Sequence, residues 1–124
     1  MANPNIVNTT SIYGNSSQTS LTTTSATQII NNAASSGKIY KINSIIVANV
    51  DGTSAANITI NIYSAASLGG TAYPIASTVS VPANSSFIAL DRSTGVYLLE
   101  NQSVGATAGS ASDLVVTASW EEIS

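Results

Sequence analysis

The residues of this sequence that could do acid–base chemistry are carboxylates. There are six, namely Asp51, Asp91, Glu100, Asp113, Glu121 and Glu122. Hydrolysis of a glycoside needs two carboxyl groups that face each other across the substrate. Glu121 and Glu122 are adjacent, and adjacent residues of a strand point to opposite faces, so they cannot form such a pair by themselves. We therefore expect these carboxylates to be solvated charges at turns, strand ends and the C-terminal tail.

Histidine and cysteine are absent, which removes the commonest general bases, nucleophiles and transition-metal ligands. No Asp-x-Asp pattern or acidic loop provides the closely spaced oxygen ligands that calcium needs. The glycines at residues 69–70 and 105–109 lack the strand-to-helix context and the lysine of a phosphate-binding loop. The sequence therefore predicts no enzyme activity, no catalytic, cofactor-binding or metal-binding residue, and no cofactor.

Aromatic side chains could provide a platform on which a sugar ring stacks. The candidates are Tyr13, Tyr40, Tyr63, Tyr73, Tyr97 and Trp120. A host-glycan-binding module would present them as a solvent-facing cluster with Asn or Asp nearby. The simpler interpretation places most of them at strand ends, with the ring buried and the hydroxyl in water. Both interpretations stay open at this level.

The surface must be built mainly from Ser, Thr, Asn and Ala, because only 7% of the residues are charged while 44% are hydrophobic. Ordinary soluble domains carry about 25% charged residues. A surface with so little charge repulsion suits a protein that packs against neighbours. The three basic residues, Lys38, Lys41 and Arg92, form no basic patch, which excludes nucleic-acid binding through phosphate neutralisation.

Neither a secretory signal nor a membrane span is expected. Residues 1–5 have no basic start and no apolar run. No stretch approaches the roughly 18 consecutive apolar residues that cross a bilayer. At 124 residues, the chain is expected to form one domain.

The clearest strand pattern lies in residues 38–63, which we interpret as two strands joined by a tight polar turn at residues 51–52. Apolar and polar residues alternate without a fault over residues 57–63, which is typical of a half-buried strand. In the first of the two strands, most apolar residues lie on one face, but Ile45 and Val47 lie on the opposite face and would also have to be shielded from water. A central place in the sheet, or a partner chain, would provide this shielding.

About eight short strands and no helix are predicted. Residues 21–30 are rich in β-branched side chains, and short apolar runs then turn about every ten residues. In the last strand one face carries Leu114, Val116, Ala118 and Trp120, and we expect Trp120 to close one end of the core. This pattern indicates an all-β protein with a single antiparallel β-sandwich. We predict a jelly-roll-like sandwich, with an immunoglobulin-like sandwich as the nearest rival.

Residues 1–20 are polar and turn-rich, and we predict that they form an extended N-terminal arm in front of a β-sandwich domain at residues 21–124. An ordinary edge strand or a frayed terminus is the alternative. The apolar anchors of the arm are Ile6, Val7, Ile12 and Tyr13.

Residues 37–53, 73–83, 97–100 and 119–124 carry a resemblance to a known group. The chain resembles the small virion structural proteins of marine and cyanobacterial tailed phages over roughly its whole length. The resemblance implies a particle component present in many copies, built on a jelly-roll-like sandwich, and in the first place a capsid decoration or cement protein. The chain departs from the group at Trp120, where a tyrosine is expected, and at residues 100–102, where an acidic-Gly-Asp turn is expected. A tail, neck or fibre-associated position therefore stays open.

These features predict a non-enzymatic virion protein that binds and stabilises the capsid lattice. We expect it on the capsid surface after synthesis in the host cytoplasm. Its expected partners are the major capsid protein or other virion proteins and further copies of itself, with a trimer favoured, and neither nucleic acid nor a membrane. The predicted interface residues are Ile6, Val7, Ile12, Tyr13, Ile45 and Val47.

Overall fold

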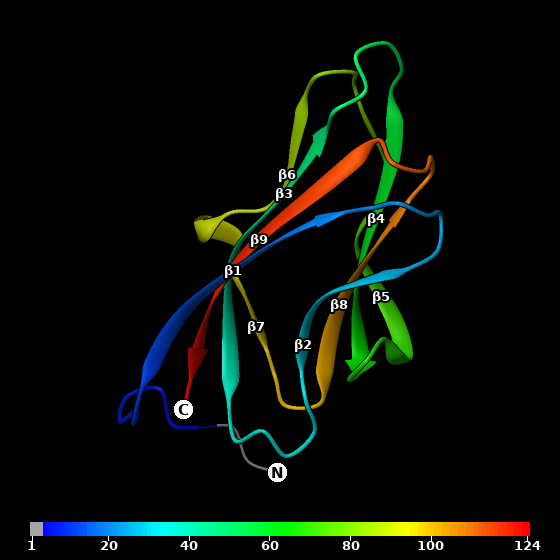
Figure 1. The fold of residues 1–124 in the computed structure, drawn as a ribbon. Coiled ribbons are helices and arrows are strands. Elements are labelled where there is room, and N and C mark those ends of the chain that lie inside the picture. The colour runs from blue at the N-terminus through cyan, green and yellow to red at the C-terminus, as the bar shows by residue number, and fades with distance from the viewer. Residues whose placement is uncertain (1–3) are drawn as a thin grey trace.

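The computed structural model describes residues 4–124, in which the regular elements are strands apart from one short 3-10 helix (Figure 1). In chain order the elements are β1 (Ile12–Ser20), β2 (Thr27–Asn32), β3 (Ile39–Asn49), β4 (Ala56–Ala65), β5 (Gly69–Val81), β6 (Ser86–Leu90), the short 3-10 helix η1 (Arg92–Thr94), β7 (Val96–Leu98), β8 (Gln102–Ala108) and β9 (Leu114–Ile123). In the described part of the chain, no helix has the length and hydropathy needed to cross a bilayer. The predicted all-β class is confirmed.

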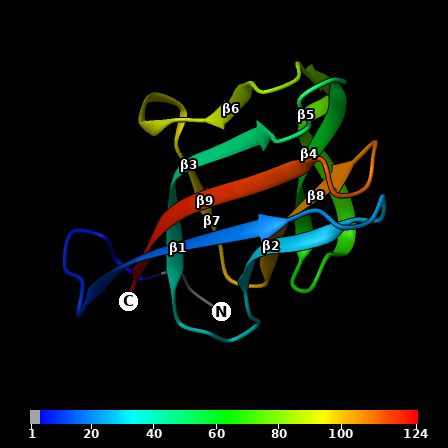
Figure 2. The same cartoon turned by 45° about the horizontal axis from the view of Figure 1, so that its top comes forward.

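Two antiparallel sheets form a sandwich (Figure 2). The five-stranded sheet has the order β1-β9-β3-β6, with β7 also paired to β3, and the four-stranded sheet has the order β2-β8-β4-β5. Strands from the start of the chain therefore pair with strands from its end, and strands from the middle of the chain pair with each other. The pairs are β1 with β9, β2 with β8, β3 with β6 and β7, and β4 with β5. This is one long hairpin wound into two layers, which is the jelly-roll arrangement. The predicted jelly-roll-like sandwich is confirmed, and the immunoglobulin-like alternative is not observed.

Alternate apolar residues of the central strands fill the space between the sheets. Leu114, Val116 and Ala118 of β9 and Ile58 and Ile60 of β4 are completely buried, as the alternation predicts. Burying a Val, Leu or Ile side chain stabilises the fold by about 1.5–3 kcal/mol relative to leaving it exposed. The stability of the domain therefore lies in the middle strands of both sheets.

Ile45 and Val47 belong to this core, so their predicted role at an interface is wrong. The chain itself buries both completely. The register between β3 and β9 shifts between Ile42 and Ser44, so that Asn43 is an extra residue in β3. Such a bulge reverses the face to which later residues of the strand point. An unbroken alternation counted along the sequence places these two side chains on the wrong face.

β3 and β4 do not form the predicted hairpin, because β3 lies in the five-stranded sheet and β4 in the four-stranded sheet. The connection between them crosses from one layer to the other. Asn49 fixes it, since its buried side-chain Nδ2 donates to the carbonyl oxygens of Ser54 at 3.0 Å and Val81 at 2.9 Å. Alternation shows which face of a strand is buried but not to which sheet the strand belongs.

Residues 12–20 form the edge strand β1, which was the alternative to a free arm. β1 pairs with β9 along its whole length without a register shift. Of the predicted arm, residues 4–11 precede the strand, and residues 1–3 lie outside the described residues. The sandwich therefore begins at Ile12 and not at Leu21.

Candidate interaction site

The candidate site lies where β1, the end of β9 and the start of β3 run side by side. The register places Tyr13 beside Glu122 and Glu122 beside Tyr40, while Asn15 lies beside Trp120. Trp120 and Glu122 share the face of β9 that carries the core residues, so these two side chains and their cross-strand neighbours form a row that faces the other sheet. Tyr13 is nevertheless 64% exposed. The four-stranded sheet therefore does not cover this end of β1.

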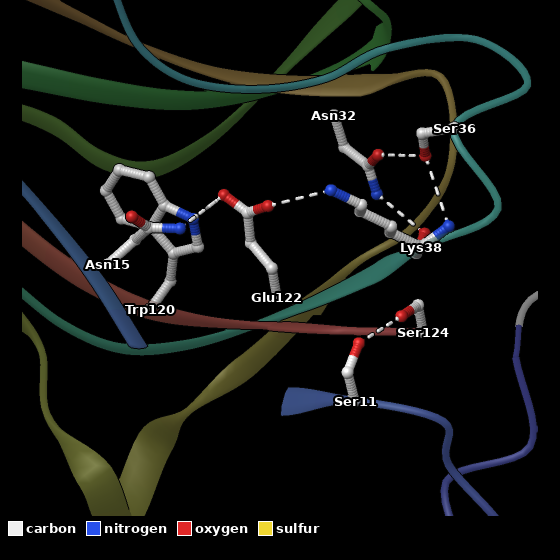
Figure 3. Close-up of polar contacts among 8 residues, drawn as sticks. All are labelled: Ser11, Asn15, Asn32, Ser36, Lys38, Trp120, Glu122 and Ser124. Atoms are coloured by element: carbon white, nitrogen blue, oxygen red, sulfur yellow. Dashed lines mark hydrogen bonds and ion pairs between the residues drawn. The ribbon is translucent and has the colours of Figure 1, made fainter. Parts of the chain in front are cut away.

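Glu122 connects three segments of the chain in this row (Figure 3). Its Oε1 lies 3.2 Å from Lys38 Nζ in an ion pair. Its Oε2 accepts hydrogen bonds from Asn15 Nδ2 at 2.5 Å and from Trp120 Nε1 at 3.4 Å. We call these four residues the Glu122 cluster. Because the Lys38 side chain is 40% exposed, the ion pair itself contributes little, and the main effect of the cluster is to hold β1 and the start of β3 against β9.

The Lys38 backbone is held by the buried side chain of Asn32. Asn32 Nδ2 donates to the carbonyl oxygens of Lys38 at 2.9 Å and Leu98 at 3.2 Å. Ser36 Oγ donates to Asn32 Oδ1, and Lys38 N–H donates to Ser36 Oγ at 3.2 Å (Figure 3). Every polar atom of the Asn32 side chain is therefore used to fix the connection between β2 and β3.

Tyr40 and Trp120 form the floor of the site. Their ring centroids are 6.4 Å apart and the planes differ by 22°, which is a stacked arrangement. Burial, and then the negative charge of Glu122, raise the pKa of the Tyr40 phenol, while Lys38 opposes them. Tyr40 is therefore a neutral, rigid part of the site at ordinary pH.

The N-terminal segment, defined here as residues 4–11, continues from β1 past the end of the sheet (Figure 2). The backbone N–H groups of Thr10 and Ser11 both donate to the carbonyl oxygen of Ser124, and the two serine hydroxyls lie 2.8 Å apart. Before this anchor, Ile6 is 50% exposed and Val7 92% exposed. The segment therefore presents two apolar side chains to solvent.

The structure brings four of the predicted interface residues to one end of the molecule. Ile6 and Val7 lie on the N-terminal segment and Ile12 and Tyr13 at the start of β1, and all four are at least half exposed. Their role at an interface stays a prediction. Sequence reasoning missed the polar residues beside them, namely Asn15, Lys38 and Glu122. The spacing of two residues between Trp120 and Glu122 could have shown that they share one face of a strand. That Asn15 and Lys38 lie beside Glu122 follows only once the strand order is known.

The other carboxylates that the structure places in turns have structural roles there. Asp91 caps η1, and its pKa is lowered by the Ser93 hydroxyl and by the backbone N–H groups of Ser93 and Thr94. The Asp51 pKa is lowered by hydrogen bonds from Thr53. Across residues 4–124, no group of three or more acidic residues is arranged to hold a metal ion, and no pocket is found.

The exposed tyrosines do not gather into one platform. Tyr13, Tyr73 and Tyr97 are 64%, 60% and 42% exposed and lie on β1, β5 and β7. Tyr97 pairs with Lys41, which directly follows Tyr40 in β3. Because neighbouring strand residues point to opposite faces, Tyr97 lies on the face of the sheet opposite to Tyr13 and Tyr40. The clustered arrangement expected of a glycan-binding module is absent from these described residues.

Comparisons with known proteins show the fold alone. No protein-family model matches the chain, and no curated protein matches it. A solved structure from work on Bacillus endospore appendages, described as a novel family of disulfide-linked pili, is similar with a TM-score of 0.53. The two chains are 18% identical, and the match covers 91% of this chain and 88% of that chain. This chain is thus similar in its sandwich to a subunit of those appendages.

Proposed function

We propose that this chain is a non-enzymatic structural subunit of a phage virion, a decoration or cement protein that binds the capsid lattice. The proposal is supported by the resemblance of several segments to small virion proteins and by a surface with few charges. Its expected partners are the major capsid protein or other virion proteins.

The observation that carries the proposal is the exposed apolar pair on the N-terminal segment. Val7 is 92% exposed and Ile6 50% exposed, and neither belongs to the hydrophobic core. Ile12 and Tyr13 follow at the start of β1 and are 54% and 64% exposed, on opposite faces of the strand. Apolar side chains that gather at one place on a surface mark a site of interaction with another protein.

The test compares two sets of substitutions at opposite ends of the molecule. The double variant Ile6→Ser, Val7→Ser removes the exposed pair. Val50→Ser is the matched control, because Val50 is 59% exposed and follows the far end of β3. Binding to purified phage capsids that lack the protein is measured by co-sedimentation.

We expect the double variant to bind the capsids about a hundredfold more weakly, since a buried apolar side chain contributes about 1.5–3 kcal/mol. The Val50→Ser control should bind like the wild type. Equal occupancy of the capsids by the wild type and the double variant would contradict the proposal.

A second candidate is a subunit of a protein filament. The similarity to the endospore appendage structure favours it, since those appendages are described as pili. The 124 residues contain no cysteine, so disulfides between these residues could not link the subunits of such a filament. Filaments seen by electron microscopy in the concentrated protein would favour this candidate over the capsid.

A further inference from the structure

Three of the four outer edges of the sandwich are interrupted in ways that hinder pairing with another strand. β2 has a register shift between Gln28 and Ile30. β5 contains Pro74 and pairs with β4 through several register shifts. The edge opposite β1 in the five-stranded sheet is divided into β6 and β7 by η1. Bulges, prolines and short strands are the means by which proteins protect sheet edges.

β1 has none of these protections. It is nine residues long, its register with β9 is unbroken, and it contains no proline and no charged residue. Figures 1 and 2 show it on the outside of the five-stranded sheet, with β9 on its other side. A long, regular and uncharged edge is a template for another strand.

The hydrogen bonds at the two ends of β1 show which backbone groups are unpaired. Ser11 and Ser124 exchange two backbone hydrogen bonds, and Leu21 N–H donates to Leu114 O at the other end. In an antiparallel ladder the bonded residues alternate, so the odd-numbered residues of β1 bond to β9. The N–H and C=O groups of the even-numbered residues point outward, and these residues are Ile12, Gly14, Ser16, Gln18 and Ser20.

We propose that this free edge pairs antiparallel with β1 of a second copy of the chain, which joins the two five-stranded sheets into one continuous sheet. The proposal deepens the proposed function, on which it rests, by naming one contact between copies. The outward-pointing residues of both copies are even-numbered, so a two-fold axis at Ser16 pairs all nine residues of each strand. Ile12 then lies opposite Ser20 of the second copy, and Gly14 lies opposite Gln18.

The side chains fit this register. Tyr13 lies opposite Thr19 of the second copy on both sides of the axis, which is a favourable aromatic and β-branched pair. Asn15 lies opposite Ser17 of the second copy.

A second copy suits this edge better than a strand that carries charge, because β1 has no charged side chain to pair with one. The broken edges β2, β5 and β6–β7 of a neighbour cannot match nine regular residues. The contact is therefore two-fold and produces a dimer. The trimer predicted from the sequence would need β1 to meet a different surface of its neighbour.

The test places charges at the two-fold axis. Ser16 is exposed and its N–H is not bonded to β9, so Ser16→Lys and Ser16→Glu should leave the fold intact. Each variant alone places like charges opposite each other, whereas an equal mixture places opposite charges there. Ser80→Lys on the exposed edge of β5 is the matched control. Mass is measured by sedimentation equilibrium, and folding by urea denaturation.

We expect the wild type and Ser80→Lys to be dimers. Each Ser16 variant alone should dissociate at least about tenfold more readily, and the mixture should recover the dimer. Ser16→Pro removes the N–H donor at the axis and should give a folded monomer. Amide exchange gives a second readout, because Gly14, Ser16 and Gln18 should be protected only at concentrations where the dimer forms.

Three results would overturn the inference: a monomeric wild type at every concentration tested, an oligomer that Ser16→Pro and Ser16→Lys leave unchanged, or a mixture of oppositely charged variants that stays monomeric. Capsid binding through the N-terminal segment does not depend on these results. A monomer that still binds capsids would reject the pairing alone, and a dimer that does not bind them would reject the capsid proposal alone.

Discussion

The two edges of the five-stranded sheet are built in different ways. β1 is one unbroken strand without a fully buried residue. The opposite edge is divided between β6 and β7, and it buries Leu90 and Leu98 in the core. Between its two strands, Asp91 caps η1 with a reciprocal pair of hydrogen bonds with Thr94. One edge is thus fixed by packing and interrupted, while the other is regular and accessible.

The difference indicates that folding and interaction use different edges of the same sheet. The broken edge contributes apolar burial and offers no long template for another strand. β1 contributes backbone hydrogen bonds to β9 and the Asn15 contact of the Glu122 cluster, and its outer backbone groups stay available. An outward-facing residue on β1 can therefore change with little loss of stability, whereas the inward-facing Leu90 and Leu98 of the opposite edge cannot.

The largest expected difference between the edges is in stability. Leu98→Ala removes a completely buried side chain from β7 and should lower the free energy of unfolding by about 2–5 kcal/mol. Ile12→Ala removes a side chain that is 54% exposed on β1 and should change it by no more than about 0.5 kcal/mol. Urea denaturation at low protein concentration measures both, so that self-association does not add to the stability. Similar losses for the two variants would contradict the division of roles.

The same division explains how much of the fold could be predicted from the sequence. β4 and β9 could be predicted because their inward residues are apolar and their outward residues polar, as at Ile58 and Ile60. β1 carries polar residues on both faces, including Asn15, Ser17 and Thr19, and so has no alternation to detect. Its strand structure comes from backbone pairing with β9, which depends on residues about a hundred positions away in the chain.

The candidate site could be predicted only in part for a related reason. The exposure of Ile6 and Val7 could be predicted because they stand alone in a polar segment. Ile45 and Val47 could not be assigned correctly, because the bulge at Asn43 changes their face and no local signal marks it. The Glu122 cluster needs the order β1-β9-β3, which alternation does not determine.

A smaller effect is expected when the link between Glu122 and β1 is weakened. Glu122→Gln removes the ion pair with Lys38, whose side chain is 40% exposed, and the pair should contribute about 0.2–1 kcal/mol. The amides of Tyr13 and Asn15, which bond to β9, should exchange roughly two- to fivefold faster. Glu121→Gln is the control, because Glu121 faces away from the cluster and accepts a hydrogen bond from Asn43 at 3.4 Å. Faster exchange in both variants would mean that a general loss of stability, and not the cluster, controls β1.

The smallest effect concerns the turn that divides the opposite edge. Asp91 Oδ1 accepts hydrogen bonds from Ser93 Oγ at 2.6 Å, Ser93 N at 2.9 Å and Thr94 N at 3.1 Å. These bonds hold its pKa below the ordinary value of 3.8. The stabilisation is therefore fully present above the unfolded pKa and is lost as the pH falls through the folded pKa, where the carboxylate becomes protonated.

Asp91→Asn should consequently make the stability less dependent on acid pH, because the amide keeps an acceptor oxygen but does not titrate. Unfolding by urea at a series of pH values from about 2 to 7 measures the slope in each protein. The effect should be small because Asp91 is fully exposed to solvent. An unchanged slope in Asp91→Asn would mean that the carboxylate keeps these hydrogen bonds in the unfolded chain as well. Asp91 would then cap η1 without stabilising it, and the break between β6 and β7 would depend on the packing of Leu90 and Leu98 alone.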